Sequence, residues 1–239
     1  MKNVKRIFTL IAVALSLSVS SFAQNGFAVY AGGNFPVGAF AKGGSLNDIA
    51  INNVGSTLGG AATGFNAGVK YQFKLIDDLS LFLSADLFYN GMKEELKQGL
   101  ENATDMIGVD ADLPSYINVP LMIGANYTLL NIGSGSLWGE AGFGVNLRDI
   151  SDSEAEVGVI ESESDYHITT SYVWQAGAGV TLGDRVSIGV HYYAFGNSPI
   201  SGVNNTELDY DNIIGNLQNE FKVGSLKPSM VVMRLGFHF

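Results

Sequence analysis

Eight stretches of this chain alternate apolar and polar residues with a period of two, and this pattern constrains the fold most. In the last stretch the odd-numbered residues from Val231 to Phe239 are apolar, whereas Arg234 and His238 lie among the even-numbered ones. A period of two places successive side chains on opposite faces of a β-strand. Each stretch has about ten residues or more, the length that a tilted strand needs to cross a membrane. The stretches are 26–35, 64–75, 79–91, 115–129, 136–148, 168–182, 185–197 and 229–239.

Short and long connections alternate between these stretches. Tight turns are expected at 76–78, 131–135 and 183–184, and longer loops join the remaining pairs. Short periplasmic turns and long outer loops are typical of bacterial outer-membrane barrels. The sequence therefore predicts an all-β fold, an eight-stranded antiparallel up-and-down transmembrane β-barrel with four long extracellular loops. Closure would pair every strand edge, which hydrocarbon requires of a membrane-spanning sheet.

The composition agrees with a barrel whose apolar face points outwards. The chain holds 30 glycines, 14 phenylalanines and 10 tyrosines but only 5 prolines, and glycine suits curved strands and a narrow lumen. A water-soluble barrel of the lipocalin type would place its apolar face inwards, whereas here the inward faces carry the charges. Aromatic residues near strand ends predict two interfacial belts. The first belt comprises Phe27, Phe73, Tyr127, Phe237 and Phe239, and the second Phe35, Phe65, Tyr89, Tyr172 and Trp174.

The first 23 residues have the pattern of a secretory signal peptide. Basic residues precede an apolar run over 7–19, and Ser21-Phe22-Ala23 supplies small residues before the expected cleavage site. An apolar run of about thirteen residues is shorter than the roughly 20 that a membrane-spanning anchor needs. We expect residues 1–23 to be a cleaved signal peptide and 24–239 to form one outer-membrane β-barrel domain. The chain contains no cysteine, which excludes disulfides and thiol chemistry.

The chain has a formal net charge of −10, and most of its 23 acidic residues fall in the long loops. The acidic charge is therefore expected on the outer surface, which excludes nucleic acid as a partner because phosphates require basic residues. The loop 149–167 is especially rich in carboxylates. Such a loop could hold calcium, which takes oxygen ligands, but no EF-hand spacing is present and a solvated loop is the simpler interpretation.

Two motifs resemble a known family. The stretch Tyr116-Ile117-Asn118-Val119-Pro120-Leu121 and the closing Arg234-Leu235-Gly236-Phe237-His238-Phe239 are similar to segments of small outer-membrane β-barrels of the OmpA/OmpX-like, porin-like type. The resemblance implies the barrel fold and a location in the bacterial outer membrane, surrounded by lipid and lipopolysaccharide. It also implies that Phe239 is recognised by the barrel-assembly machinery. Members of this family have diverse roles, so the resemblance predicts no activity.

Six charged residues are expected inside the barrel, together with His238 near the periplasmic mouth. An eight-stranded barrel is just wide enough for side chains to fill it, and charges buried there must pair. We predict a lumen charge network made of Lys70, Asp86, Glu140 and Arg234. It either plugs the lumen or forms the selectivity constriction of a narrow pore. The other inward ionisable residues are Lys74, Arg148 and His238.

Catalysis is not expected. His191 falls on the inward face with Ser187 and Tyr193, but a nucleophilic site also needs an acid to orient the base, and this strand has none. No cofactor or metal motif is present.

We therefore predict a monomeric outer-membrane protein with a structural or surface-interaction role, a plugged lumen and acidic loops outside. Its extracellular partner is unknown. The alternative is a small passive porin-like channel for ions or small solutes. Large inward residues such as Phe88 and Trp138 favour the plug, whereas inward glycines such as Gly142 and Gly177 leave space.

Overall fold

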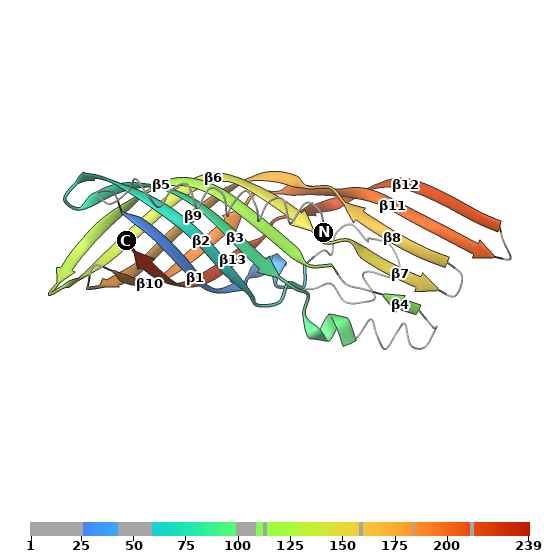
Figure 1. Cartoon of the computed structure of the whole chain (residues 1–239), viewed down its shortest axis with the longest axis horizontal. Helices are drawn as coiled ribbons and strands as arrows, with labels where there is room; N and C mark the ends of the chain where they lie inside the picture. Colours follow the sequence, from blue (N-terminus) through green and yellow to red (C-terminus); the bar gives the residue numbers. More distant parts are fainter. Residues whose placement is uncertain are drawn as a thin grey trace.

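The computed structural model describes residues 26–42, 59–98, 109–111, 114–157, 160–183, 185–210 and 213–239. Eight antiparallel strands close into a barrel in the order β1-β13-β10-β9-β6-β5-β3-β2 (Figure 1). The predicted barrel is therefore confirmed, whereas the expected signal peptide, residues 1–23, lies outside the described residues. The barrel strands are β1 (Phe27–Pro36), β2 (Gly64–Ile76), β3 (Leu79–Asn90), β5 (Tyr116–Ile132), β6 (Gly135–Ile150), β9 (Thr169–Leu182), β10 (Val186–Phe195) and β13 (Ser229–His238).

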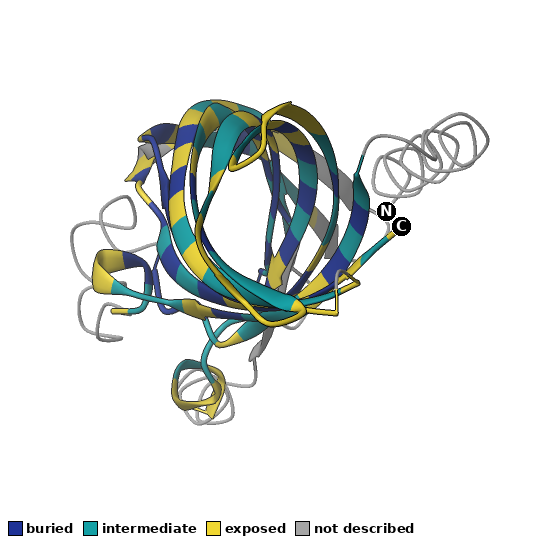
Figure 2. Ribbon diagram, turned by 90° about the vertical axis from the view of Figure 1, so that its left-hand side faces the viewer, coloured by how far each residue is buried: buried dark blue, intermediate teal, exposed yellow. Residues whose placement is uncertain are grey.

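The first and last barrel strands pair with each other and close the sheet. Their register runs from Ala28 opposite His238 to Pro36 opposite Met230. The period-two pattern then places alternate residues inside and outside, and Figure 2 shows buried and exposed positions alternating along the strands around the ring. Both barrel termini lie at the end that carries the short turns, and we call this end the turn end. No helix among the described residues is long and apolar enough to span a membrane.

The outside of the barrel is an apolar band. Phe143 is 68% exposed near the middle of β6, and Leu235 is 59% exposed on β13. Among the barrel strands, all of which are described, Asp149 is the one charged residue at an outward position, and it lies at the rim. Aromatic side chains of both expected belts are exposed, among them Phe73 and Phe237 near the turn end and Tyr172 and Trp174 near the other end. The molecule is thus a barrel that faces lipid, as an outer-membrane protein does.

A second sheet extends two of the barrel hairpins beyond the other end. Its order is β12-β11-β8-β7-β4, and we call it the extension sheet (Figure 1). Two of the four connections expected as long loops are therefore β-hairpins, β7–β8 and β11–β12. Apolar–polar alternation does not reveal these hairpins, because both faces of their strands are polar over much of their length. The strands are β4 (Val109–Ala111), β7 (Ser153–Val157), β8 (Ile160–Tyr166), β11 (Ser198–Tyr210) and β12 (Ile213–Leu226).

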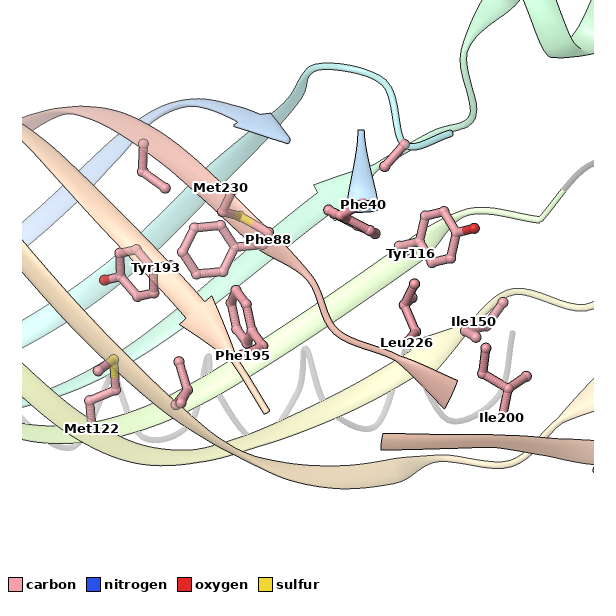
Figure 3. Close-up of a cluster of buried hydrophobic side chains, with 13 residues drawn as sticks. Phe40, Phe88, Tyr116, Met122, Ile150, Tyr193, Phe195, Ile200, Leu226 and Met230 are labelled. Atoms are coloured by element: carbon pink, nitrogen blue, oxygen red, sulfur yellow. The ribbon is translucent and has the colours of Figure 1, made fainter. Parts of the chain in front are cut away.

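Buried apolar side chains gather in a cluster on the side of the extension sheet (Figure 3). Phe88 lies with its ring 5.0 Å from that of Tyr193 and 6.0 Å from that of Phe195, and all three are fully buried. The short 3-10 helix η1 (Gly38–Phe40) adds Phe40, whose ring lies 5.2 Å from that of Tyr116. We call this cluster the apolar plug. It comprises Phe40, Ala61, Phe88, Tyr116, Met122, Ile150, Val173, Tyr193, Phe195, Ile200, Leu226, Met230 and Val232.

The outward apolar band predicts a large cost for a charge at its centre. Phe143→Arg should lower the free energy of unfolding in bilayers by about 2 to 4 kcal/mol, because the guanidinium would face hydrocarbon. Urea titration of the folded barrel in lipid vesicles measures this loss. Leu217→Arg is the matched control, since Leu217 is similarly exposed but lies on β12 of the extension sheet. An equal loss in both variants would contradict the assignment of the band to lipid.

Candidate functional site: the barrel lumen

Glu140 on β6 is the centre of the first lumen ion pair. The Nζ of Lys70 on β2 lies 2.6 and 2.8 Å from its two carboxylate oxygens, and both side chains are nearly inaccessible to solvent. Gln175 donates to one oxygen at 3.0 Å and Asn126 donates to the other at 3.2 Å. Lys70 Nζ also lies 4.8 Å from the centre of the Phe82 ring, a favourable position for a cation. The carboxylate is therefore paired and multiply hydrogen-bonded, as a buried charge requires.

Arg234 and Asp86 form the second pair. Arg234 Nη2 donates to Asp86 Oδ1 at 2.9 Å, and its Nε donates to Asn66 Oδ1 at 3.1 Å. The guanidinium lies 4.4 Å from the centre of the Tyr30 ring and 5.0 Å from that of Tyr193. Both rings therefore lie within cation–π distance of the guanidinium. Gly68 faces Asp86 across β2 and β3, and a β-carbon there would collide with the Asp86 carboxylate and the Tyr30 ring.

The four residues of the predicted network thus lie inside the barrel as two ion pairs, Lys70 with Glu140 and Arg234 with Asp86. Lys74 does not join them, although it was expected to face inwards. Its side chain is 66% exposed at the turn end and lies 3.2 Å from Asp77. The strand has already left the narrow lumen at this position, so solvent rather than a buried carboxylate surrounds the ammonium group.

Ser187 and His191, which share the inward face of β10, contact different partners. His191 Nδ1 lies 3.3 Å from Glu140 Oε1, an acid supplied by another strand. Ser187 instead contacts His238, with 3.0 Å between Oγ and Nε2. Each contact joins two different strands, so the order and register of the strands determine both of them. Ser187 and His238 thus lie in contact, but no hydrogen bond joins His238 to a carboxylate in the described part of the chain.

A polar cavity of about 220 Å³ occupies the lumen at the turn end. Hydroxyl and amide side chains such as Ser80, Asn126 and Thr181 line its walls, and the Lys70–Glu140 pair lies at its inner end together with Arg234. The lumen therefore changes character along its length, from a polar cavity through two ion pairs to the apolar plug. Water and ions can occupy the first of these three regions, whereas hydrophobic side chains make up the third.

The carboxylate-rich loop 149–167 is largely the β7–β8 hairpin. Carboxylate oxygens of Asp152, Glu163 and Asp165 lie within 4.8 Å of one another. Surface carboxylates commonly gather in this way without a metal ion, so the geometry adds no support for a specific site.

Comparison with known proteins identifies the fold. No family model matches the chain, and no curated protein matches it in sequence. A major outer membrane protein from Thermus thermophilus is similar in structure, with a TM-score of 0.53 and 12% identity, over 90% of this chain and 99% of that one. OprG from Pseudomonas aeruginosa matches with a TM-score of 0.45 at 13% identity, covering 90% of this chain and 96% of its own. The chain therefore has the fold of small outer-membrane β-barrels.

Removal of one partner of the Lys70–Glu140 pair should be costly. Glu140→Ala should lower the free energy of unfolding by about 3 to 5 kcal/mol, because it leaves the Lys70 charge buried and unpaired. Lys70→Met combined with Glu140→Leu should lose less than Glu140→Ala alone, since neither charge then remains. Equilibrium urea unfolding measures all three chains.

Lys74→Ala is the control for this series, because it removes an exposed lysine from an ion pair on the same strand. The expected change is within about 0.5 kcal/mol. If Glu140→Ala were as mild as Lys74→Ala, the buried pair would not be a determinant of stability.

Proposed function

We propose that this protein is a closed outer-membrane barrel that anchors an acidic sheet at the cell surface. The apolar plug is the observation that carries the proposal. Phe88, Tyr193 and Phe195 are fully buried inside the barrel, and each contacts at least one of the others through its ring. A lumen filled in this way excludes water, so the barrel acts as an anchor rather than as a path for solutes.

The extension sheet is the surface that the barrel would display. If the short turns face the periplasm, as they do in bacterial outer-membrane barrels, this sheet would lie outside the cell. Its β8 strand carries Glu163 and Asp165, and Glu207 and Glu220 are exposed on β11 and β12. Few basic residues accompany them, so the sheet repels anionic surfaces and favours a cationic partner. The role is therefore structural or one of surface interaction, and it involves no catalysis.

The surroundings of the barrel follow from the same proposal. Lipid and lipopolysaccharide would contact the outward band, and the barrel would remain a monomer in the membrane because its closed sheet leaves no edge there for a second copy. The Phe239 side chain is 71% exposed, and its backbone N–H donates to Phe27 O at 2.9 Å. This exposed ring is available to the barrel-assembly machinery during insertion. Residues 1–23 would be removed on export as a signal peptide.

The alternative function is a small passive channel, and the 220 Å³ cavity supports it for part of the lumen. A channel needs a continuous aqueous path, however, and the apolar plug interrupts one. We therefore favour the closed barrel. A conductance measurement distinguishes it from the channel.

Conductance of the refolded protein in a planar bilayer tests the proposal. The wild-type chain should show no discrete openings, whereas Phe88→Ala combined with Tyr193→Ala should open a path past the plug. Phe65→Ala combined with Tyr89→Ala is the control, because these two rings stack at 5.2 Å on the outside of the barrel. Discrete openings of the wild-type chain, unaltered in the plug variant, would establish the channel instead.

A further inference from the structure

Arg148 is the third cation buried in the lumen, and it lies beside the apolar plug rather than among the two ion pairs. It is 1% exposed near the end of β6. Its Nε donates to Asn118 Oδ1 at 3.0 Å, and its Nη1 donates to Leu226 O at 3.1 Å and to Ser198 Oγ. These contacts join the barrel wall to the first residue of β11 and the last residue of β12. Arg148 therefore fastens the base of the β11–β12 hairpin to the barrel.

The partners of Arg148 are all neutral. Lys70 and Arg234 each have a buried carboxylate within 3 Å, whereas no ion pair joins Arg148 to any carboxylate of the described part of the chain. An uncompensated buried charge costs several kcal/mol, so natural proteins supply a counter-charge or leave such a group in water. Arg148 is buried too deeply for bulk water to perform this role.

Unused hydrogen-bonding atoms surround the guanidinium. Arg148 Nη2 and Asn118 Nδ2 are buried and make no hydrogen bond with the protein. The orientation of the Asn118 amide is determined, because its Oδ1 accepts from both Arg148 and Asn146 at 3.0 Å. Its NH₂ group therefore remains free to donate. Two hydrogen-bonded side chains, Arg148 and Asn118, thus each leave a buried donor for a ligand, and the donor of Arg148 is cationic.

Two further unused atoms lie on the neighbouring strands. Asn146 Oδ1 and Ser171 Oγ are also buried without a partner, and the two residues are opposite each other in the β6–β9 register. The serine hydroxyl can donate either to a ligand or to the Asn146 oxygen, since its hydrogen rotates. The unused atoms around Arg148 are therefore mostly donors. The one unused amide oxygen, Asn146 Oδ1, can accept from the Ser171 hydroxyl on β9.

We propose that Arg148 and Asn118 bind a small inorganic anion such as chloride inside the extension end of the barrel. The anion would neutralise the buried guanidinium and accept from Arg148 Nη2 and Asn118 Nδ2. Ordered water could satisfy these N–H groups but would leave the charge uncompensated. Because Arg148 also holds Ser198 and Leu226, anion binding would stabilise the junction between barrel and extension sheet. This site is independent of whether the lumen conducts.

Thermal unfolding in two salts of equal ionic strength tests the site. Sodium chloride should raise the unfolding midpoint of the detergent-folded protein by about 3 °C relative to sodium gluconate, whose anion is too large for a buried site. Arg148→Gln should abolish this difference, whatever its effect on the midpoint itself. Lys74→Gln is the control, because it removes an exposed charge and should retain the difference. A difference that is absent from the wild-type chain, or that persists in Arg148→Gln, would overturn the proposal.

A second variant keeps the test decisive if Arg148→Gln does not fold. Asn118→Asp keeps the size of the side chain and supplies a fixed carboxylate beside Arg148, so the chloride dependence should disappear from a folded barrel. Crystals of the wild-type chain grown in sodium bromide should show an anomalous peak in contact with Arg148 Nη2 and Asn118 Nδ2. Bromide found at surface positions only would exclude the buried site.

Discussion

The pairing of β1 with β13 is the constraint on which the rest of the structure depends. A free strand edge in hydrocarbon would leave backbone N–H and C=O groups without partners, at several kcal/mol each. The register from Ala28 opposite His238 to Pro36 opposite Met230 removes that edge. Once the sheet is closed, period-two alternation leaves each residue one of two environments, lipid or lumen. Charged residues of the membrane-spanning strands must therefore point inwards, so the ionisable side chains of the barrel gather in the lumen.

A closed ring of eight strands brings opposite walls close enough for side chains to meet. Lys70 of β2 reaches Glu140 of β6, and Arg234 of β13 reaches Asp86 of β3. These contacts cross the lumen instead of following neighbouring strands, and they connect parts of the wall that share no backbone hydrogen bond. The rings of Tyr30, Phe82 and Tyr193 cover the two cations. Beyond them, on the side of the extension sheet, lies the apolar plug.

The sequence predicts the barrel well because each spanning strand faces lipid on one side and the lumen on the other. Apolar residues therefore recur at every second position along the strand. The extension sheet left no such pattern: in β8, Ser162, Glu163, Ser164 and Asp165 are polar on both faces. The inward position of Glu140 is also readable from alternation. The partner of Glu140 cannot be predicted from alternation, because the stagger of the strands and the width of the lumen decide whether Lys70 or Lys74 reaches the carboxylate. The role of Arg148 depends on Ser198 and Leu226, which belong to strands that alternation did not reveal.

Whether the lumen is closed can be measured directly, because the chain has no cysteine and a single introduced thiol is therefore the only site that a thiol reagent can label. Ser187→Cys places a thiol in the cavity at the turn end, and Gln218→Cys places one on the exposed surface of β12. Both variants would be inserted with uniform orientation into vesicles and treated with a membrane-impermeant thiol reagent on one side. From the extension side the reagent should label Gln218→Cys and leave Ser187→Cys unmodified. Labelling of Ser187→Cys from that side would show that the lumen is open.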